Sequence, residues 1–223
     1  MKLKGLHPED IQLLPEGGGW LLVEFGGDSK KETDALARQA MEKLKKQKNP
    51  PSMKLFSNLE EEEKVWEIRE SGLGATANVP TVPLMWPGWE DAAVEPCRLG
   101  DYLRDFKKLL KQYDYDTSLY GHFGQGCVHC RIPFDLFTHD GIQKYLKFIN
   151  EAADIVLNYN GSFSGEHGDG QSRAQLLEKM YGTDLMEAFH RFKKIWDPEW
   201  KMNPDKKTDA YLPNQNLRLG TRY

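Results

Sequence analysis

A glycine-rich turn flanked by two histidines is the feature that most constrains how this chain can fold. The stretch Tyr120-Gly-His-Phe-Gly-Gln-Gly-Cys-Val-His129 contains three glycines between and beside its histidines. Glycine has no Cβ, so the backbone can turn sharply there and another group can approach it closely. We therefore predict a β-hairpin with strands at residues 118–122 and 127–132.

Side chains alternate between the two faces of a strand, so Cys127, His129 and Arg131 are predicted to share one face. The turn then places His122 beside that face. A second flexible stretch, Gly161-Ser-Phe-Ser-Gly-Glu-His-Gly-Asp-Gly170, carries a glutamate followed by a histidine. Either stretch alone is most often a structural turn, but their joint occurrence favours one chemical site.

Two imidazoles and one carboxylate can bind a divalent ion such as zinc or manganese and leave a position open for substrate. His122 and His129 supply the imidazoles, and Glu166 could supply the carboxylate. His167 would then be free to move protons near pH 7.

The pair Cys127 and Cys130 also forms a C-x-x-C pattern. A redox C-x-x-C usually begins a helix, whereas these two side chains are predicted to point to opposite faces of a strand. The same geometry disfavours a disulfide and a zinc knob built from Cys127, His129 and Cys130.

The motifs His122-x-Gly-Gln-Gly-Cys-x-His129 and Ser164-Gly-Glu-His-Gly-Asp-Gly170 resemble the C-terminal domain of FAD-linked oxidases of the vanillyl-alcohol-oxidase type. That family includes glycolate oxidase and D-lactate dehydrogenase, and the resemblance is greatest to large members that join the flavin module to an iron-sulfur module. It extends from about Trp20 to Lys206. Supporting matches lie at residues 66–71, 86–91, 131–135 and 202–206.

The resemblance implies a role for each motif residue. His122, His129 and Glu166 would bind a divalent metal, and His167 would be the catalytic base. Arg69 would bind the substrate carboxylate through its planar fork of donors, although an ion pair with Glu63 or Glu70 is the alternative for a helix-surface arginine.

The resemblance also brings Glu166, His167 and Asn203 toward the flavin, although the motif that begins at Asn203 could equally be a plain helix stop. Two positions depart from the common family pattern. Gln125-Gly-Cys127 replaces an Asp-Gly-Asn sequence, which predicts a different metal affinity or choice. Arg131 replaces a frequent asparagine, and it would either favour a dianionic substrate or pair with Asp135 or Asp169.

The chain carries no G-x-G-x-x-G or P-loop pattern for a dinucleotide, and three cysteines cannot supply a four-cysteine iron-sulfur cluster. We therefore predict that FAD is bound in the full-length protein by a domain absent from this chain, with an iron-sulfur domain or subunit as a further partner. The chain would then be the substrate- and metal-binding portion of an enzyme that oxidises D-2-hydroxy acids, inactive without that domain. A stand-alone metal-dependent hydrolase and a non-enzymatic interaction module are the alternatives.

Composition excludes several other classes. The chain has 223 residues, 39% of them hydrophobic, and a net charge of −4, which favours a folded protein and argues against a nucleic-acid surface. Neither a membrane span nor a signal peptide is evident, so a cytoplasmic location is expected.

The periodicity predicts an α+β fold, with an antiparallel ferredoxin-like sheet covered by helices and a small C-terminal helical subdomain. The expected strands lie at residues 20–25 and 53–56 and in the hairpin. One helix is expected after Ser29 as far as about Leu44, and another from Asn58 through Arg69, with Ser29 and Asn58 as their caps. Further helices are expected at about 99–110 and 140–159, and a helical pattern at about 176–195 carries stop signals at Gly182 and Pro198. The irregular stretch 71–96 is expected to cover the site. Its Trp86 and Trp89 are more often packing residues than ligand contacts, but a cover also needs such apolar side chains to exclude water. The predicted domains are residues 1–160 and 161–210, followed by a tail or linker at 211–223.

Overall fold

The computed structural model describes residues 10–76, 80 and 82–217. The chain divides into two compact units, residues 1–75 and 76–223, and each is described by itself. The division predicted between residues 160 and 161 stays a prediction. Within the described part, no helix combines the length and the apolar character needed to cross a bilayer.

The first unit is helical. A short 3-10 turn, η2 (Asp10–Leu13), precedes the two long helices α1 (Lys30–Lys45) and α2 (Leu59–Glu70). The short helix α3 (Gly72–Thr76) follows at the end of the unit. Ser29 and Asn58 cap the two long helices as predicted, because their side chains accept from the backbone N–H of Glu32 at 3.3 Å and of Glu60 at 3.0 Å. Each side chain satisfies one of the amides that a helix start leaves unpaired.

The two strands predicted in this unit, at residues 20–25 and 53–56, are wrong, because the described residues there have no strand structure. Val23, one of the two alternating apolar residues behind the first prediction, is 69% exposed. An extended segment becomes a strand only when another strand supplies partners for its N–H and C=O groups, and none does so among the described residues of this unit.

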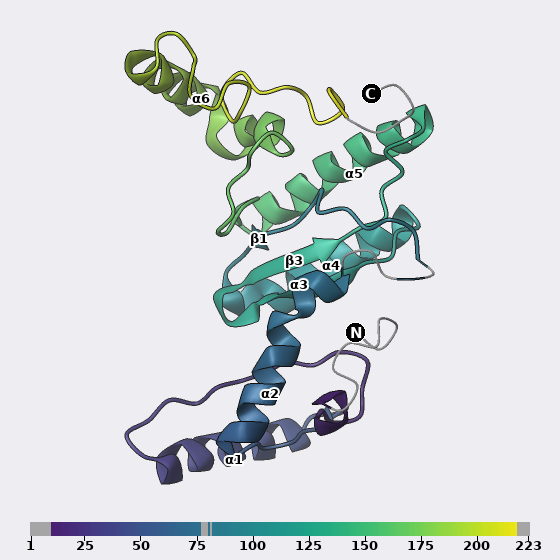
Figure 1. Ribbon diagram of the computed structural model, residues 1–223, viewed down its shortest axis with the longest axis vertical. Helices are drawn as coiled ribbons and strands as arrows, with labels where there is room; N and C mark the ends of the chain where they lie inside the picture. Colours follow the sequence, from purple (N-terminus) through teal and green to yellow (C-terminus); the bar gives the residue numbers. More distant parts are fainter. Residues whose placement is uncertain (1–9, 77–79, 81, 218–223) are drawn as a thin grey trace. The chain divides into compact units, whose positions relative to one another are not determined.

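The second unit is built on a three-stranded antiparallel sheet. Its strands β1 (Ala92–Ala93), β2 (Ser118–His122) and β3 (Cys127–Arg131) lie in the order β1-β3-β2 (Figure 1). The predicted hairpin is confirmed, with the short turn η4 (Phe123–Gln125) between β2 and β3. Strand β1 was missed, since it lies inside the stretch predicted to be irregular.

Gly126 closes the hairpin turn in the left-handed region, with φ of 73°. A Cβ at this position would lie 1.8 Å from the carbonyl oxygen of Val94. Only glycine fits there, because the left-handed conformation and the close approach of a second backbone both exclude a side chain. The same contact fixes the turn against the residues that follow β1.

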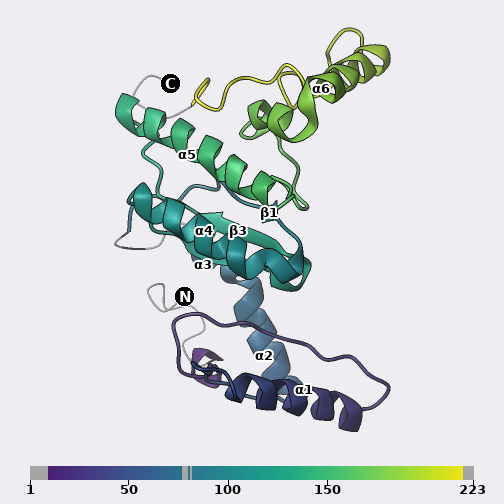
Figure 2. The ribbon, with the colours of Figure 1, turned by 180° about the vertical axis from the view of Figure 1, so that it is seen from behind.

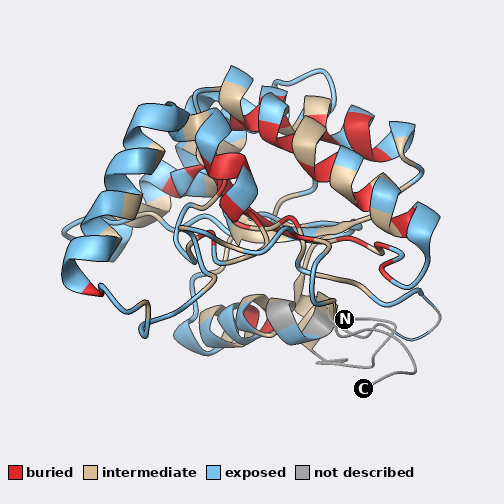
Figure 3. Ribbon diagram, turned by 90° about the horizontal axis from the view of Figure 1, so that it is seen from above, coloured by how far each residue is buried: buried red, intermediate tan, exposed pale blue. Residues whose placement is uncertain are grey.

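Two helices cover one face of the sheet. They are α4 (Leu99–Gln112), which follows the short turn η3 (Pro96–Arg98), and α5 (His139–Asn158); α4 lies behind β3 in Figure 1 and in front of it in Figure 2. Along the helices, buried residues alternate with exposed ones (Figure 3). The buried residues of α4 and α5 include Tyr102, Phe106 and Phe148. They pack against Val128 and Cys130 of β3. The predicted α+β class with an antiparallel sheet is confirmed.

Helices also form the C-terminal part of the second unit. A short turn, η5 (Ala174–Leu176), leads into α6 (Leu177–Trp196), which is kinked at Gly182, where φ is 75°. Gly182 interrupts the helix, and Asp197, the residue before Pro198, caps its end, so both predicted stops are confirmed. The tail at residues 211–217 has no helix or strand, and the rest of the predicted tail lies outside the described residues.

Candidate metal and proton-transfer site

The hairpin brings the two motif histidines to one face of the sheet. Tyr120 pairs with His129 and His122 with Cys127, so His122, Cys127 and His129 project to the same side. The rings of His122 and His129 are 5.8 Å apart. The side chain of His129 is 4% exposed and that of His122 is 48% exposed, so one histidine is buried and the other is accessible to solvent.

The opposite face of β3 belongs to the core. The Cys130 thiol points into it and donates to the carbonyl oxygen of Trp89, whereas the Cys127 thiol donates to Asp91 Oδ1 at 3.2 Å. The two thiols are free and diverge as the sequence predicted. A disulfide or redox pair therefore does not form at this C-x-x-C.

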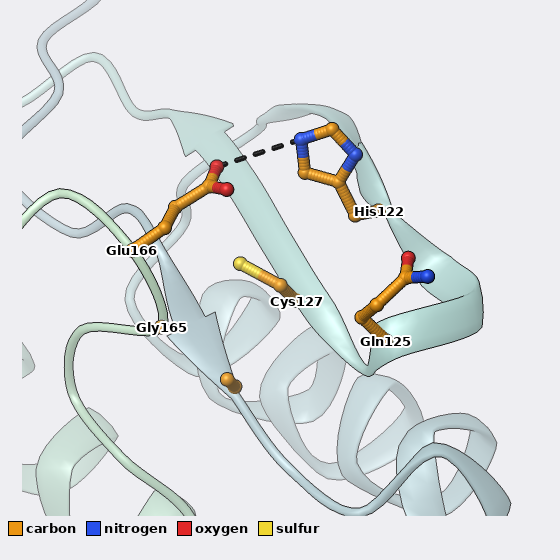
Figure 4. A pocket seen from close by; sticks show the side chains of 6 residues that line it. His122, Gln125, Cys127, Gly165 and Glu166 are labelled. Carbon is orange, nitrogen blue, oxygen red and sulfur yellow. Dashed lines mark ion pairs between the residues drawn. The ribbon is translucent and has the colours of Figure 1, made fainter.

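The loop after α5 carries Glu166 to the histidines. Ser162 forms two backbone hydrogen bonds with Ala93 of β1, at 2.8 and 3.0 Å, and so anchors the loop to the sheet edge. From there Glu166 Oε1 reaches His129 Nε2 at 2.9 Å and His122 Nε2 at 3.5 Å. Figure 4 shows the carboxylate and the His122 ring facing each other across the hollow beside Cys127.

His167 also faces the Glu166 carboxylate. Its Nε2 is 3.3 Å from Glu166 Oε1 and its Nδ1 is 3.5 Å from Glu90 Oε1. The ring stacks on that of His129, with centroids 4.8 Å apart and an interplanar angle of 8°. Because its side chain is 47% exposed, the imidazole can meet a molecule that enters from solvent.

Asp91 lies beneath this loop and is fully buried. Its carboxylate accepts from Ser164 Oγ at 2.6 Å, from the N–H of His167 at 2.7 Å and from the N–H of Glu166 at 3.1 Å. Burial by itself raises the pKa of this carboxyl, but the hydrogen bonds from Ser164, His167, Glu166 and Cys127 outweigh it and lower the pKa to about 2. Asp91 is therefore an anion at neutral pH.

Burial shifts the pKa of the neighbouring histidine and that of the neighbouring thiol in opposite directions. It lowers the pKa of His129, and the nearby His167 adds to that effect while Glu166 opposes it. Burial, together with Asp91, raises the pKa of the Cys127 thiol to about 12. At neutral pH His129 is thus a neutral imidazole able to bind a metal, and Cys127 is a thiol.

Four groups in this region offer ligand atoms within 4.8 Å of one another, namely Asp91, His129, Glu166 and His167. Both oxygens of Asp91 already accept hydrogen bonds from protein donors, so Asp91 suits an orienting role better than a ligand role. His122, Gln125, Cys127 and Glu166 line a hollow of about 440 Å³ beside the group. The arrangement offers nitrogen and oxygen ligands, a nearby proton acceptor and room for a small molecule.

Arg131 ends β3 on the same face as His129. Its Nε is buried and has no hydrogen-bond partner among the described residues. The alternative pairing, with Asp135 or Asp169, is not observed among the described residues. Asp135 instead accepts from the N–H of Phe137 at 2.9 Å and that of Thr138 at 3.2 Å.

Two other predicted site residues lie elsewhere. Arg69 lies in the last turn of α2, in the first unit, and its role stays a prediction. Asn203 is exposed and has a φ of 46°. Three residues beyond it, Lys206 Nζ donates to Gln171 Oε1 at 2.9 Å, so this segment returns to the end of the loop that carries Glu166.

Sequence reasoning missed Glu90, Asp91 and Arg173. The guanidinium of Arg173 donates at 2.6 Å to the carbonyl oxygens of both Glu90 and Gly168, and so ties the stretch before β1 to the loop. Glu90 and Asp91 lie in the matched stretch 86–91, where the resemblance was the signal that could have found them. Trp89, expected in a cover over the site, is 1% exposed and packs against Phe163 in the core.

Comparison with known proteins is consistent with this geometry. The chain is 30% identical to D-2-hydroxyglutarate dehydrogenase from Haemophilus influenzae over 84% of its length, and 32% identical to the Pseudomonas putida enzyme of that name over 83%. It is 25% identical to glycolate oxidase subunit GlcD from Bacillus subtilis, also over 83%. It covers 19%, 18% and 38% of these relatives, respectively.

The family described as FAD linked oxidases, C-terminal domain, matches residues 2–207. This match covers most of the chain and includes both the hairpin and the Glu166 loop. The chain therefore belongs to the C-terminal domain family of the FAD linked oxidases.

Proposed function

We propose that this chain is the substrate- and metal-binding portion of an FAD-dependent oxidoreductase that acts on D-2-hydroxy acids. The observation that carries the proposal is the convergence of Glu166 on His122 and His129, with distances of 3.5 and 2.9 Å from its Oε1 to their Nε2 atoms. Relatives named D-2-hydroxyglutarate dehydrogenase and glycolate oxidase subunit support the substrate class.

The residues present fit a divalent metal. His122, His129 and Glu166 offer two imidazole nitrogens and a carboxylate oxygen, a donor set suited to zinc or manganese. His129 is neutral at pH 7, because burial lowers its pKa, and a neutral imidazole is the form that binds metal. A metal bound by these residues would polarise the substrate hydroxyl and lower its pKa.

We assign proton acceptance to His167. Its ring is partly exposed, and its Nδ1 faces the Glu90 carboxylate at 3.5 Å. A proton on Nδ1 would leave Nε2 as the acceptor for the substrate hydroxyl proton. Stacking on His129 limits the tilt of the His167 ring and holds it near the metal ligands.

The described residues form an antiparallel sheet and offer no parallel strand–helix–strand unit for a dinucleotide. We therefore propose that a separate FAD-binding domain is the partner of this chain. An iron-sulfur domain or subunit is a further proposed partner, which rests on the resemblance of the sequence to large family members.

We infer from Arg131 that the substrate carries a second anionic group. Its Nε is buried without a hydrogen-bond partner among the described residues, although the guanidinium also interacts with the phenol of Tyr120. A guanidinium has five N–H donors and pairs well with a carboxylate. We propose that Arg131 binds the distal carboxylate of a dianionic 2-hydroxy acid. A role for Arg69, which lies in the first unit, in binding the carboxylate next to the hydroxyl rests on the resemblance of the sequence alone.

Metal content tests the ligand assignment. Wild-type protein and the variants His122→Ala, His129→Ala and Glu166→Ala would be loaded with zinc or manganese, dialysed and measured by elemental analysis. We expect about one ion per wild-type chain and a large loss in each variant. His190→Ala is the control, because this partly exposed histidine of α6 pairs with Asp209. Unchanged metal content in all three variants would overturn the assignment.

Ligand binding tests the substrate. The metal-loaded chain would be titrated with D-2-hydroxyglutarate, its L-enantiomer and D-lactate while the NMR signals of the histidine rings are followed. We expect preference for the D-dianion, and Arg131→Gln should remove the preference over D-lactate. Ester or amide hydrolysis by the metal-loaded chain without flavin would favour the hydrolase alternative instead.

A further inference from the structure

Asp91 connects the loop that carries Glu166 and His167 to the sheet that carries His129. We infer that Asp91 is a positioning residue, which sets the geometry of the metal ligand Glu166 and of the proton acceptor His167 without binding metal or substrate itself. This inference rests on the function proposed above and deepens it.

Three consecutive backbone amides converge on this one residue. The N–H of Gly165 donates to the Asp91 carbonyl oxygen at 2.6 Å, the N–H of Glu166 lies 3.1 Å from both carboxylate oxygens, and the N–H of His167 donates to Oδ2 at 2.7 Å. Successive N–H groups that point to one anion form a concave cradle. The cradle fixes the backbone from which both functional side chains project.

Asp91 is itself held by the sheet. Its N–H donates at 3.0 Å to the carbonyl oxygen of Val128, the residue before His129. Its φ of 70° lies in the left-handed region, which aspartate tolerates better than most residues. This bond links Asp91, and with it the loop, to the strand residue that precedes the buried His129.

Two side-chain donors complete the set around the carboxylate. Ser164 Oγ donates to Oδ2 at 2.6 Å and also accepts from the N–H of Gly168 at 2.6 Å, while Cys127 Sγ donates to Oδ1 at 3.2 Å. With each oxygen engaged by at least two donors, the carboxylate would have to break existing bonds to bind an ion. Asp91 therefore lies close to His129, Glu166 and His167 because it holds the loop in place, and we do not assign it as a fourth metal ligand.

Asp91→Asn tests the inference with little change of volume. The amide keeps one acceptor oxygen but turns an NH₂ group toward donors, so some of the loop amides lose their acceptor. We expect zinc affinity, measured by isothermal titration calorimetry, to fall by about 10- to 100-fold, as is typical when an outer partner of a metal ligand is removed. The backbone amides of Glu166 and His167 should shift and exchange faster with solvent by NMR.

Asp135→Asn is the matched control. Asp135 also accepts from two backbone amides, those of Phe137 and Thr138, but it does so before the start of α5. Its replacement should lower stability and leave zinc affinity unchanged. Equal zinc affinity in wild type, Asp91→Asn and Asp135→Asn would overturn the inference.

The same samples separate this inference from the proposed function. If the wild-type chain binds no zinc, the metal-ligand assignment fails, but hydrogen exchange still tests Asp91. Protection of the Glu166 and His167 amides that is lost in Asp91→Asn alone would support positioning by Asp91. Protection that is equal in Asp91→Asn and the control would refute it.

Discussion

Gly165→Ala should wedge the functional loop away from the sheet. A Cβ at Gly165 would lie 2.9 Å from Cys127 Sγ and 3.0 Å from the Cβ of Ala93, both below ordinary van der Waals contact. The thiol cannot turn aside without loss, because it donates to Asp91 Oδ1. Either the loop or β3 must therefore move.

The structure allows a magnitude for this change. Overpacking at a tightly filled position destabilises a protein by about 1–3 kcal/mol. Because the new Cβ would be too close to Cys127 Sγ on one side and to Ala93 Cβ on the other, we expect Gly165→Ala to cost about 2 kcal/mol, the middle of that range. Cys127→Ala removes the nearer obstacle and costs about 1 kcal/mol for the lost hydrogen bond. In that background Gly165→Ala should cost about 1 kcal/mol less than in wild type.

Urea unfolding of the four proteins in this double-mutant cycle measures the difference. Unfolding should be followed by NMR signals of residues 82–217, so that the second unit is monitored by itself. Gly124→Ala is the control, because a Cβ there meets no atom within 4 Å. An equal effect of Gly165→Ala with and without Cys127 would refute the contact argument.

Three further predictions address the core, the thiols and the acid stability. Phe148→Ala should destabilise the second unit by about 3–5 kcal/mol in urea, because this fully buried ring contacts four other aromatic rings. Iodoacetamide should modify exposed Cys97 in the folded protein but modify buried Cys127 and Cys130 only after unfolding, as peptide mass spectrometry would show. Asp91, whose pKa falls from 3.8 to about 2 on folding, should contribute about 2 kcal/mol above pH 4 that is lost as the pH falls toward 2.

Each of these has an outcome that contradicts it. A Phe148→Ala cost below about 1 kcal/mol would show a core that relaxes into the space. Equal labelling of Cys97 and Cys127 in the native protein would show that β3 is accessible. For Asp91, Asp91→Asn should flatten the loss of stability between pH 4 and 2, and an unchanged acid profile in that variant would refute the assignment.

Local signals predicted much of the fold. The caps at Ser29 and Asn58, the hairpin around Gly126 and the kink at Gly182 were readable because each depends on a few neighbouring residues. The strands predicted at residues 20–25 and 53–56 were wrong because a strand requires a partner, and partners are chosen by the whole fold. Strand β1 was missed for the same reason, since two alanines carry no strand signal of their own.

The candidate site divides in a similar way. Strand alternation was enough to place His122 and His129 on one face, and the glycines marked the loop of Glu166 and His167. Asp91 carried no such mark. Its importance arises only when amides from residues 165–167, more than 70 positions away, meet its carboxylate and carbonyl oxygen.

The sequence by itself determined which chemical groups are available and on which short turns they lie, because backbone alternation and glycine freedom act within a few residues. The tertiary structure decided how Glu166 meets His129 at 2.9 Å and what holds it there. That contact depends on β1, β3 and the loop after α5 packing around one buried carboxylate. Burial and hydrogen-bond satisfaction are properties of the assembled unit, so no local pattern could have specified them.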